Sequence, residues 1–194
     1  MELRVDPVTG LGVPGNPFFA SSNANTKRIW SYGHRNVQGL ALRPKDGAFW
    51  TVEHGTGRDD EINRGVQGNF GWDPVPGYNE STPMTDLTKF PDAVTAAWSS
   101  GDPTVATSGA TWLNGGWKAW NDTLAVAALK DSSLRIMRAS ADGLTLTEID
   151  RIFVGTYGRL RTAQLGPGGK LYLTTSNAVP GGSPIDKILE VTPS

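Results

Sequence analysis

The chain has 194 residues, a formal net charge of -1 and 19% charged residues, so it has no basic excess suited to nucleic acid or to an acidic membrane surface. It has no cysteine, which excludes disulfides, thiolate metal sites and thiol nucleophiles. No apolar run approaches the length that crosses a bilayer, and residues 1–6 resemble a strand rather than a signal peptide.

The composition predicts an all-β chain. It includes 24 glycines, 13 prolines and 7 tryptophans, which favour turns and sheet-forming aromatic positions. No segment shows a convincing amphipathic helical period, whereas short strand patterns recur along the whole chain. We therefore expect an antiparallel β architecture.

Three units of similar pattern follow one another, covering residues 39–63, 110–138 and 162–191. Each unit has a strand, a glycine-containing turn, a second strand, a loop and a third strand. The expected strands span residues 39–44, 48–52, 60–63, 110–113, 123–129, 133–138, 162–167, 170–175 and 186–191. Repeated antiparallel units of this kind indicate the blades of a β-propeller.

About three blades are expected, whereas propellers usually close with four to eight. The sequence therefore predicts a single partial β-propeller domain over residues 1–194. A long Pro/Gly/Thr-rich insertion over residues 72–102 interrupts it, and loops of that length are commonly functional. We expect a second copy, a partner chain or further sequence to close the ring.

Two polar runs lie between sheet-forming segments. The first, residues 32–40, carries Arg35, Asn36 and Gln38, and the second, residues 53–63, follows after one strand. Strands on either side of such runs hold polar groups rigidly and direct them into a cavity. These runs are candidates for a binding site.

Two further features concern cations. Arg159 and Arg161 alternate around Leu160, so on a strand both side chains share one face. Two guanidinium groups on one face suit an anion, such as carboxylates or quinone oxygens, although exposed arginines of an edge strand give the same pattern. Lys130 ends the apolar strand 124–129, at a channel mouth or simply at the surface.

The ordered set of runs 32–40, 53–63, 70–72 and 158–161 resembles the soluble quinoprotein sugar dehydrogenases of the glucose/sorbosone dehydrogenase type. The resemblance extends from Leu3 to Val191. Members of that family are six-bladed β-propellers that use pyrroloquinoline quinone (PQQ) and calcium. The resemblance implies the same two cofactors for this chain.

By that resemblance, matching positions carry the cofactor-binding roles. Arg35 and Asn36 match the arginine and asparagine of the first family motif, Lys130 matches a later lysine, and Arg159 with Arg161 matches an Arg-x-Arg pair. In the family these groups bind the quinone and its carboxylates. Each motif alone is weak evidence, but the ordered set is specific.

The resemblance also implies a metal site and a substrate contact. Gly55 and Thr56 stand where the family has a Gly-Pro pair whose carbonyl oxygens bind calcium, with Thr replacing Pro here. The acidic residues 59–61 could ligate the metal through their side chains, or could be solvated or capping groups. Trp98 is the candidate for an aromatic face that stacks on the substrate.

No catalytic residue is assigned within the chain. The family's general base is a histidine in its N-terminal half, before the segment that matches residues 32–40, so we expect the base in a half that this chain lacks. The chain's two histidines are His34, for which we expect a structural role, and His54, for which we expect at most an indirect one.

The function implied is PQQ- and calcium-dependent oxidation of aldose sugars to lactones, with hydride transfer to the quinone. Two alternatives stay open: a non-catalytic propeller segment that binds sugar or a protein partner, and a lactonase-like calcium propeller. The expected partners are an aldose and either a homodimer mate or a missing half. The family resemblance implies a periplasmic or secreted protein.

Overall fold

Strands supply nearly all of the regular structure. The computed structural model describes residues 1–73, 82–179, 182 and 185–193. Within these residues the helices are three short 3-10 turns, η1 (Thr26–Arg28), η2 (Lys118–Trp120) and η3 (Pro167–Gly169). None of them is long or apolar enough to span a membrane. The all-β expectation is confirmed.

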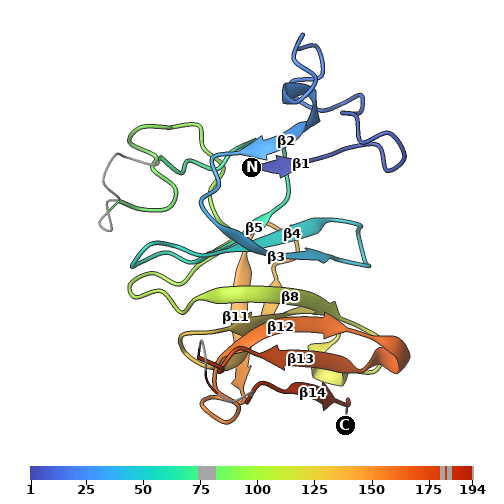
Figure 1. Cartoon of the computed structure of the whole chain (residues 1–194), viewed down its shortest axis with the longest axis vertical. Coiled ribbons are helices and arrows are strands. Elements are labelled where there is room, and N and C mark those ends of the chain that lie inside the picture. Colours follow the sequence, from blue (N-terminus) through green and yellow to red (C-terminus); the bar gives the residue numbers. More distant parts are fainter. Residues whose placement is uncertain (74–81, 180–181, 183–184, 194) are drawn as a thin grey trace.

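Four antiparallel or mixed sheets lie one above another along the long axis (Figure 1). The small sheet consists of β1 (Glu2–Leu3), β2 (Ile29–Tyr32) and β6 (Gly68–Asn69). Sheet I consists of β3 (Val37–Leu42), β4 (Phe49–Glu53), β5 (Glu61–Arg64) and β7 (Trp98–Ser99). Sheet II consists of β8 (Thr107–Leu113), β9 (Thr123–Ala128), β10 (Ser133–Ala139) and β11 (Leu146–Ile152). Sheet III consists of β12 (Leu160–Leu165), β13 (Leu171–Thr175) and β14 (Ile188–Val191).

Each of the three units expected from the sequence lies within one of sheets I, II and III. Within these three sheets two strands were not expected: β11, which pairs with the outer side of β10, and β7, which pairs with β5. In the small sheet, β2 and β6 were not expected either. Strand β7 belongs to the expected insertion 72–102, of which residues 74–81 lie outside the described part of the chain.

The first strands of sheets I, II and III lie side by side, because β8 contacts β3 on one side and β12 on the other. Glycines permit this approach. A Cβ atom at Gly39 of β3 would collide with the carbonyl oxygen of Ser108 in β8. A Cβ atom at Gly109 of β8 would lie 2.9 Å from Thr162 Cα in β12. The sheets are thus joined, backbone against backbone, along one line.

Sheet II buries both of its faces. Strand β9 is buried along its whole length, with Leu124 and Val126 facing sheet I and Ala125 and Ala127 facing sheet III. The core cluster between sheets I and II is centred on Trp50 and Trp112, whose ring centroids lie 5.7 Å apart. Because both sides of β9 face apolar cores, its sequence is apolar almost throughout and does not alternate between apolar and polar residues.

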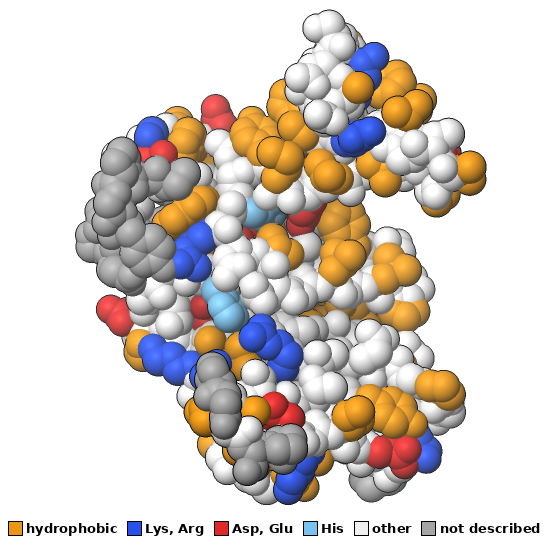
Figure 2. Space-filling view, in the orientation of Figure 1, with side chains coloured by type: hydrophobic (Ala, Val, Ile, Leu, Met, Phe, Trp, Pro, Cys, Tyr) orange, Lys and Arg blue, Asp and Glu red, His pale blue; other side chains and the backbone are white. Residues whose placement is uncertain are grey.

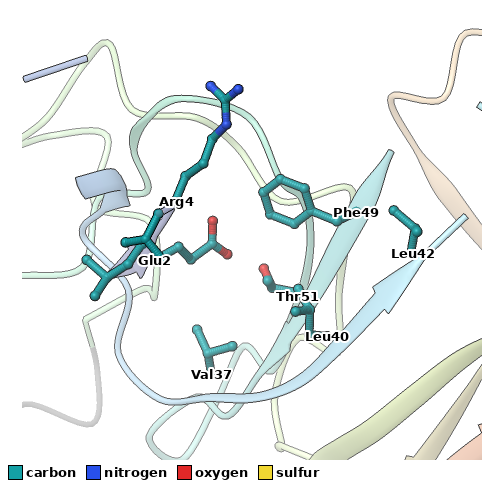
Figure 3. Close-up of a pocket in the computed structure, with 9 residues that line it drawn as sticks. Glu2, Arg4, Val37, Leu40, Leu42, Phe49 and Thr51 are labelled. Atoms are coloured by element: carbon teal, nitrogen blue, oxygen red, sulfur yellow. The ribbon is translucent and has the colours of Figure 1, made fainter. Parts of the chain in front are cut away.

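An apolar cleft of about 710 Å³ separates β1 from the exposed face of β3 and β4. Figure 3 shows Val37, Leu40, Leu42 and Phe49 directed toward this cleft, with Glu2 entering from the opposite side. Leu40 and Leu42 keep 67% and 64% of their surface exposed. The cleft has a mainly apolar lining, and Arg35, Asn36 and Gln38 of the first polar run are not among the residues that line it.

We expect Gly39→Ala to destabilise the chain by about 2 kcal/mol or more, because the added methyl group forces β3 away from β8. Gly115→Ala is the control, since nothing lies within 4 Å of its would-be Cβ and only its φ of +72° opposes alanine. Urea unfolding of both variants measures the difference. Equal destabilisation would show that the approach of β3 to β8 is not tight.

Candidate functional site

The residues expected at a cofactor site lie at one edge of sheets I, II and III. They either precede the first strand of a sheet or follow its second strand, and in an antiparallel pair these two positions are neighbours. The residues at this edge, called here the polar edge, are Arg35 and Asn36 before β3, Gly55 and Thr56 after β4, Lys130 after β9, and Arg159 and Arg161 at the start of β12.

The run 32–40 is fixed by the buried carboxylate of Glu53 at the end of β4. Its Oε2 accepts a hydrogen bond from the Arg35 backbone N–H at 3.0 Å. Its Oε1 lies 3.0 Å from His34 Nδ1 and accepts a hydrogen bond from Asn63 Nδ2 at 2.8 Å. The other nitrogen of His34 lies 2.8 Å from Ser31 Oγ. The His34 side chain is 1% exposed, in keeping with the structural role expected from the sequence.

Two further hydrogen bonds join the runs 32–40 and 53–63. The backbone N–H of His54 donates to the Asn36 carbonyl, and the Arg35 guanidinium donates to the His54 carbonyl, both at 3.0 Å. The Arg35 guanidinium also lies 5.7 Å from the ring centroid of Trp72. The sequence runs that were singled out separately therefore form one contiguous region.

Asp60 holds two loops of the polar edge together, and it is completely buried. Its Oδ1 accepts from the Gly55 backbone N–H at 2.8 Å. Its Oδ2 accepts from the N–H groups of Val105, Ala106 and Thr107 at 2.7, 2.5 and 3.3 Å. This buried carboxylate therefore fixes the backbone of the two loops by accepting hydrogen bonds from their N–H groups, and it does not face solvent. Of the two roles left open for the acidic residues, Asp60 takes that of a capping group.

Arg161 reaches across three sheets. Its Nη1 donates to Gln38 Oε1 of sheet I at 3.1 Å and lies 3.5 Å from Ser108 Oγ of sheet II. Arg159, which directly precedes β12, is exposed like Arg161, and its Nε donates to the carbonyl of Ser176, just after β13, at 3.1 Å. The two arginines therefore flank the buried Leu160 and hold different partners.

A register irregularity occurs in the first strand of each sheet at this edge. The pairing shifts at Gln38 in β3, at Ser108 and Gly109 in β8, and at Arg161 in β12. Such bulges bend a strand and redirect a side chain. Here they direct the side chains of Gln38, Ser108 and Arg161 toward one another.

Three cations of the polar edge make no ion pair with any acidic side chain in the described part of the chain: Lys130, Arg159 and Arg161. Lys130 Nζ has a long contact of 3.4 Å to Thr104 Oγ1. Arginines of the core differ, since Arg43 pairs with Asp122, and Arg135 with Asp131 and Glu148. The polar edge therefore keeps positive charge available. Figure 2 shows Lys and Arg side chains on both sides of a histidine at the left of the molecule.

His54 lies near the charges of Arg161 and Arg35. Burial lowers the pKa of its imidazole, and the nearby charges of Arg161 and Arg35 lower it further, against an opposing effect of Asp60. Its Nε2 is buried and has no hydrogen-bond partner within the described residues. The imidazole thus adds no positive charge at neutral pH.

The expected metal position offers oxygen atoms. A Cβ at Gly55 would collide with the Arg58 carbonyl, so only glycine fits this tight loop. The Oγ1 of Thr56 is buried and lacks a hydrogen-bond partner in the described structure. The same part of the chain contains no group of three or more His, Cys, Asp or Glu that could hold a metal. A cation here would depend on backbone carbonyls, on Thr56 Oγ1 and on oxygens of a ligand.

Glu53 of β4 and Glu61 of β5 lie opposite each other in sheet I, and both are buried. Burial and the neighbouring Glu53 raise the pKa of Glu61 to about 8. Thr85 Oγ1 and Asn63 Nδ2 donate to its two oxygens at 3.0 and 3.3 Å. Asp59, the third acidic residue of the run, forms an ion pair with Arg58 at 2.8 Å.

Trp98 lies in β7, opposite Ile62 of β5, and packs against the core cluster between sheets I and II. The Arg135 guanidinium lies 5.7 Å from the centroid of its ring. These contacts are those of a packing residue. Its substrate contact stays a prediction from the resemblance.

Comparisons with known proteins agree on one family. The family model described as Glucose / Sorbosone dehydrogenase matches residues 3–181. The aldose sugar dehydrogenase YliI of Escherichia coli is 35% identical over 171 residues, which are 84% of this chain and 44% of that protein. The chain spans less than half the length of this curated relative.

Solved structures agree with the fold. The soluble aldose sugar dehydrogenase from Escherichia coli in its apo form superposes with a TM-score of 0.75 at 30% identity, over 94% of this chain and 51% of that one. The PQQ-bound aldose sugar dehydrogenase from Streptomyces coelicolor gives a TM-score of 0.68 at 31% identity, over 97% and 50%.

We expect Asp60→Asn to destabilise the chain by about 3 kcal/mol, because an amide NH₂ would face backbone N–H groups and the charge that attracts them would be lost. Urea unfolding measures the change. Asp92→Asn, at an exposed position, is the matched control and should leave stability unchanged. A comparable effect of both substitutions would contradict the role given to Asp60.

The Glu61 carboxyl makes stability depend on pH. Its pKa is about 8 in the folded chain and 4.5 in an unperturbed glutamate, so the folded state binds more protons between these values. Stability is therefore greatest below about pH 4.5 for this group and falls as pH rises toward 8. Glu61→Gln should flatten that decline. Urea midpoints across this range, in metal-free buffer with a chelator, would contradict the assignment if wild type and variant declined alike.

Proposed function

The chain belongs to the glucose/sorbosone dehydrogenase family, and we propose that its polar edge binds PQQ in a protein that oxidises aldose sugars. The observation that carries the proposal is a set of cations at the edge where three sheets meet, Lys130, Arg159 and Arg161, which have no acidic partner among the described residues. Similarity to the PQQ-bound Streptomyces coelicolor enzyme supports the same ligand.

The chemistry of this edge suits PQQ. The cofactor is a planar quinone that carries three carboxylates, so it needs cations for its charges and hydrogen-bond donors for its quinone oxygens. Guanidinium groups bind carboxylates in a planar fork, and Arg161 presents such a group between two sheets. Lys130 presents an ammonium group whose one side-chain contact within the described residues is a long one to Thr104. Both groups can exchange their present partners for a ligand oxygen.

Each polar group has a separate part in this proposal. Arg159 and Arg161 would hold carboxylates, Arg35 and Lys130 would favour negative charge on the cofactor, and Asn36 would donate to an oxygen of the ring. The low pKa of His54 keeps its imidazole neutral beside Arg35 and Arg161, which avoids a further repulsive charge. The edge is thereby positive and is held rigidly by Glu53 and Asp60.

We propose calcium as the second cofactor, at the loop of Gly55 and Thr56. The unpartnered Thr56 Oγ1 supports this position, because calcium accepts hydroxyl and carbonyl oxygens. When bound, PQQ supplies the acceptor for the two electrons of aldose oxidation, and calcium polarises that acceptor as a Lewis acid. The expected product is the lactone.

We propose that the base which accepts the sugar's hydroxyl proton comes from the part of the family fold that this chain does not cover. His34 is enclosed between Glu53 and Ser31, and both of its nitrogens have partners. His54 Nε2 is buried, so it does not reach a substrate in the present arrangement. Cofactor binding and proton removal are thus divided between separate parts of the fold.

The test is titration of the purified chain with PQQ in the presence of calcium, followed by visible absorbance and tryptophan fluorescence. We expect binding, and we expect Arg161→Ala or Lys130→Ala to weaken it about tenfold or more, since each removes a hydrogen bond from a charged group. Arg138→Ala, at the opposite edge of sheet II, is the matched control and should bind as wild type does.

Absence of PQQ binding by the wild-type chain, or equal loss in the Arg138 control, would contradict the proposed site. Binding without any reduction of PQQ on addition of an aldose would agree with a base outside this chain. Reduction by the chain alone would contradict that division of roles.

A further inference from the structure

Gln38 joins two of the groups assigned to the cofactor. Its Oε1 accepts the hydrogen bond from Arg161 Nη1 at 3.1 Å, and its Nε2 donates to Asn36 Oδ1 at 2.7 Å. Asn36 directly precedes β3 and Gln38 is the second residue of that strand, and this hydrogen bond holds their side chains together. Gln38 thereby links sheet I to sheet III.

The direction of these two hydrogen bonds follows from chemistry. A guanidinium group has donors and no acceptor, so the atom of Gln38 that faces Arg161 is the amide oxygen. The other end of the same amide is then NH₂, which can only donate. Hence the atom of Asn36 that faces Gln38 is its oxygen, Oδ1. Arg161 thus determines the orientation of both amides in turn.

Because the Asn36 amide turns its oxygen toward Gln38, its Nδ2 group points away from Gln38. Its two N–H donors are directed away from that contact, where they can meet an acceptor such as a quinone or carboxylate oxygen. An unrestrained asparagine would present either its oxygen or its NH₂ group, and the oxygen would repel such a ligand. Fixing the amide removes the wrong orientation before the ligand arrives.

The strand irregularities support this assignment independently. The pairing of β3 shifts at Gln38, that of β8 at Ser108 and Gly109, and that of β12 at Arg161. In a regular ladder these side chains would follow the alternation of their strands. At these bulges Arg161 meets the side chains of both Gln38 and Ser108, in keeping with the way bulges redirect side chains at functional sites.

We propose that Gln38 is a positioning residue, which uses Arg161 as its anchor to hold the Asn36 amide with its N–H donors toward the ligand. The identity of that ligand as PQQ depends on the proposed function. The orientation of Asn36 does not, because it follows from contacts within the chain.

The first arm of the test uses the chain without ligand. Side-chain amide signals of Asn36 are followed by ¹H–¹⁵N NMR in the wild type, in Gln38→Glu and in Gln164→Leu. Glutamate keeps an acceptor for Arg161 but has no donor for Asn36, so we expect the Asn36 signals to shift. Gln164→Leu is the control, since Gln164 is exposed on β12 and donates only to the neighbouring Leu165 carbonyl. Unchanged Asn36 signals in Gln38→Glu would overturn the proposal.

The second arm measures PQQ affinity. We expect Gln38→Leu to weaken binding about tenfold, with an unchanged urea midpoint, because the exposed side chain adds little to stability. In an Asn36→Ala background the same change should cost at most about threefold, since Gln38 acts mainly through Asn36. An equal loss in both backgrounds would overturn the positioning role and indicate direct contact. A wild-type chain that binds no PQQ would refute the proposed function, while the first arm still decides the orientation of Asn36.

Discussion

The buried carboxylate of Asp60 is the interaction on which the polar edge depends. It accepts hydrogen bonds from the Gly55 loop after β4 and from the turn 105–107 that leads into β8. That turn also accepts the backbone N–H of Lys130 through the Val105 carbonyl. One charged group therefore sets the relative positions of loops from sheets I and II. Without it, the four backbone N–H groups would be buried without an acceptor, at a cost that would open the edge.

The relative positions of sheets I, II and III also depend on the line along which their first strands meet. Gly39 and Gly109 allow β3, β8 and β12 to approach with no side chain between them. At the end of that line the three strands lose their regular register, and the polar side chains of Gln38, Ser108 and Arg161 come together. A rigid apolar core between the sheets and irregular backbone at their edge thus serve different purposes. The core fixes distances, and the irregular edge supplies donors and charge.

Much of the fold and of the candidate site could be predicted from the sequence, because short local patterns encode the strand units and the motif residues. Strand pairs around glycine turns identified three units, and each lies in one sheet. The run around Arg35 and Asn36 was recognisable because its residue order matches a family motif. Strand β11 was missed because its outer position leaves it charged, with Glu148, Asp150 and Arg151 exposed or partly exposed. Strand β7 was missed because two residues give no pattern.

The sequence could not predict which polar residues serve the scaffold. Asp60 and Glu61 are adjacent acidic residues, yet one binds backbone amides and the other has its pKa raised to about 8 beside Glu53. Gln38 was visible next to Asn36, but its partner Arg161 is 123 residues away. The partners of these groups come from other sheets, so local spacing holds no information about them.

Amide hydrogen exchange of the chain with and without PQQ and calcium would test directly whether the polar edge binds these cofactors. We expect slower exchange at the polar edge, around residues 35–38, 54–57, 105–107, 130 and 159–161, with the rest of the chain unchanged. Protection confined to the apolar cleft, at Leu40, Leu42 and Phe49, would contradict it.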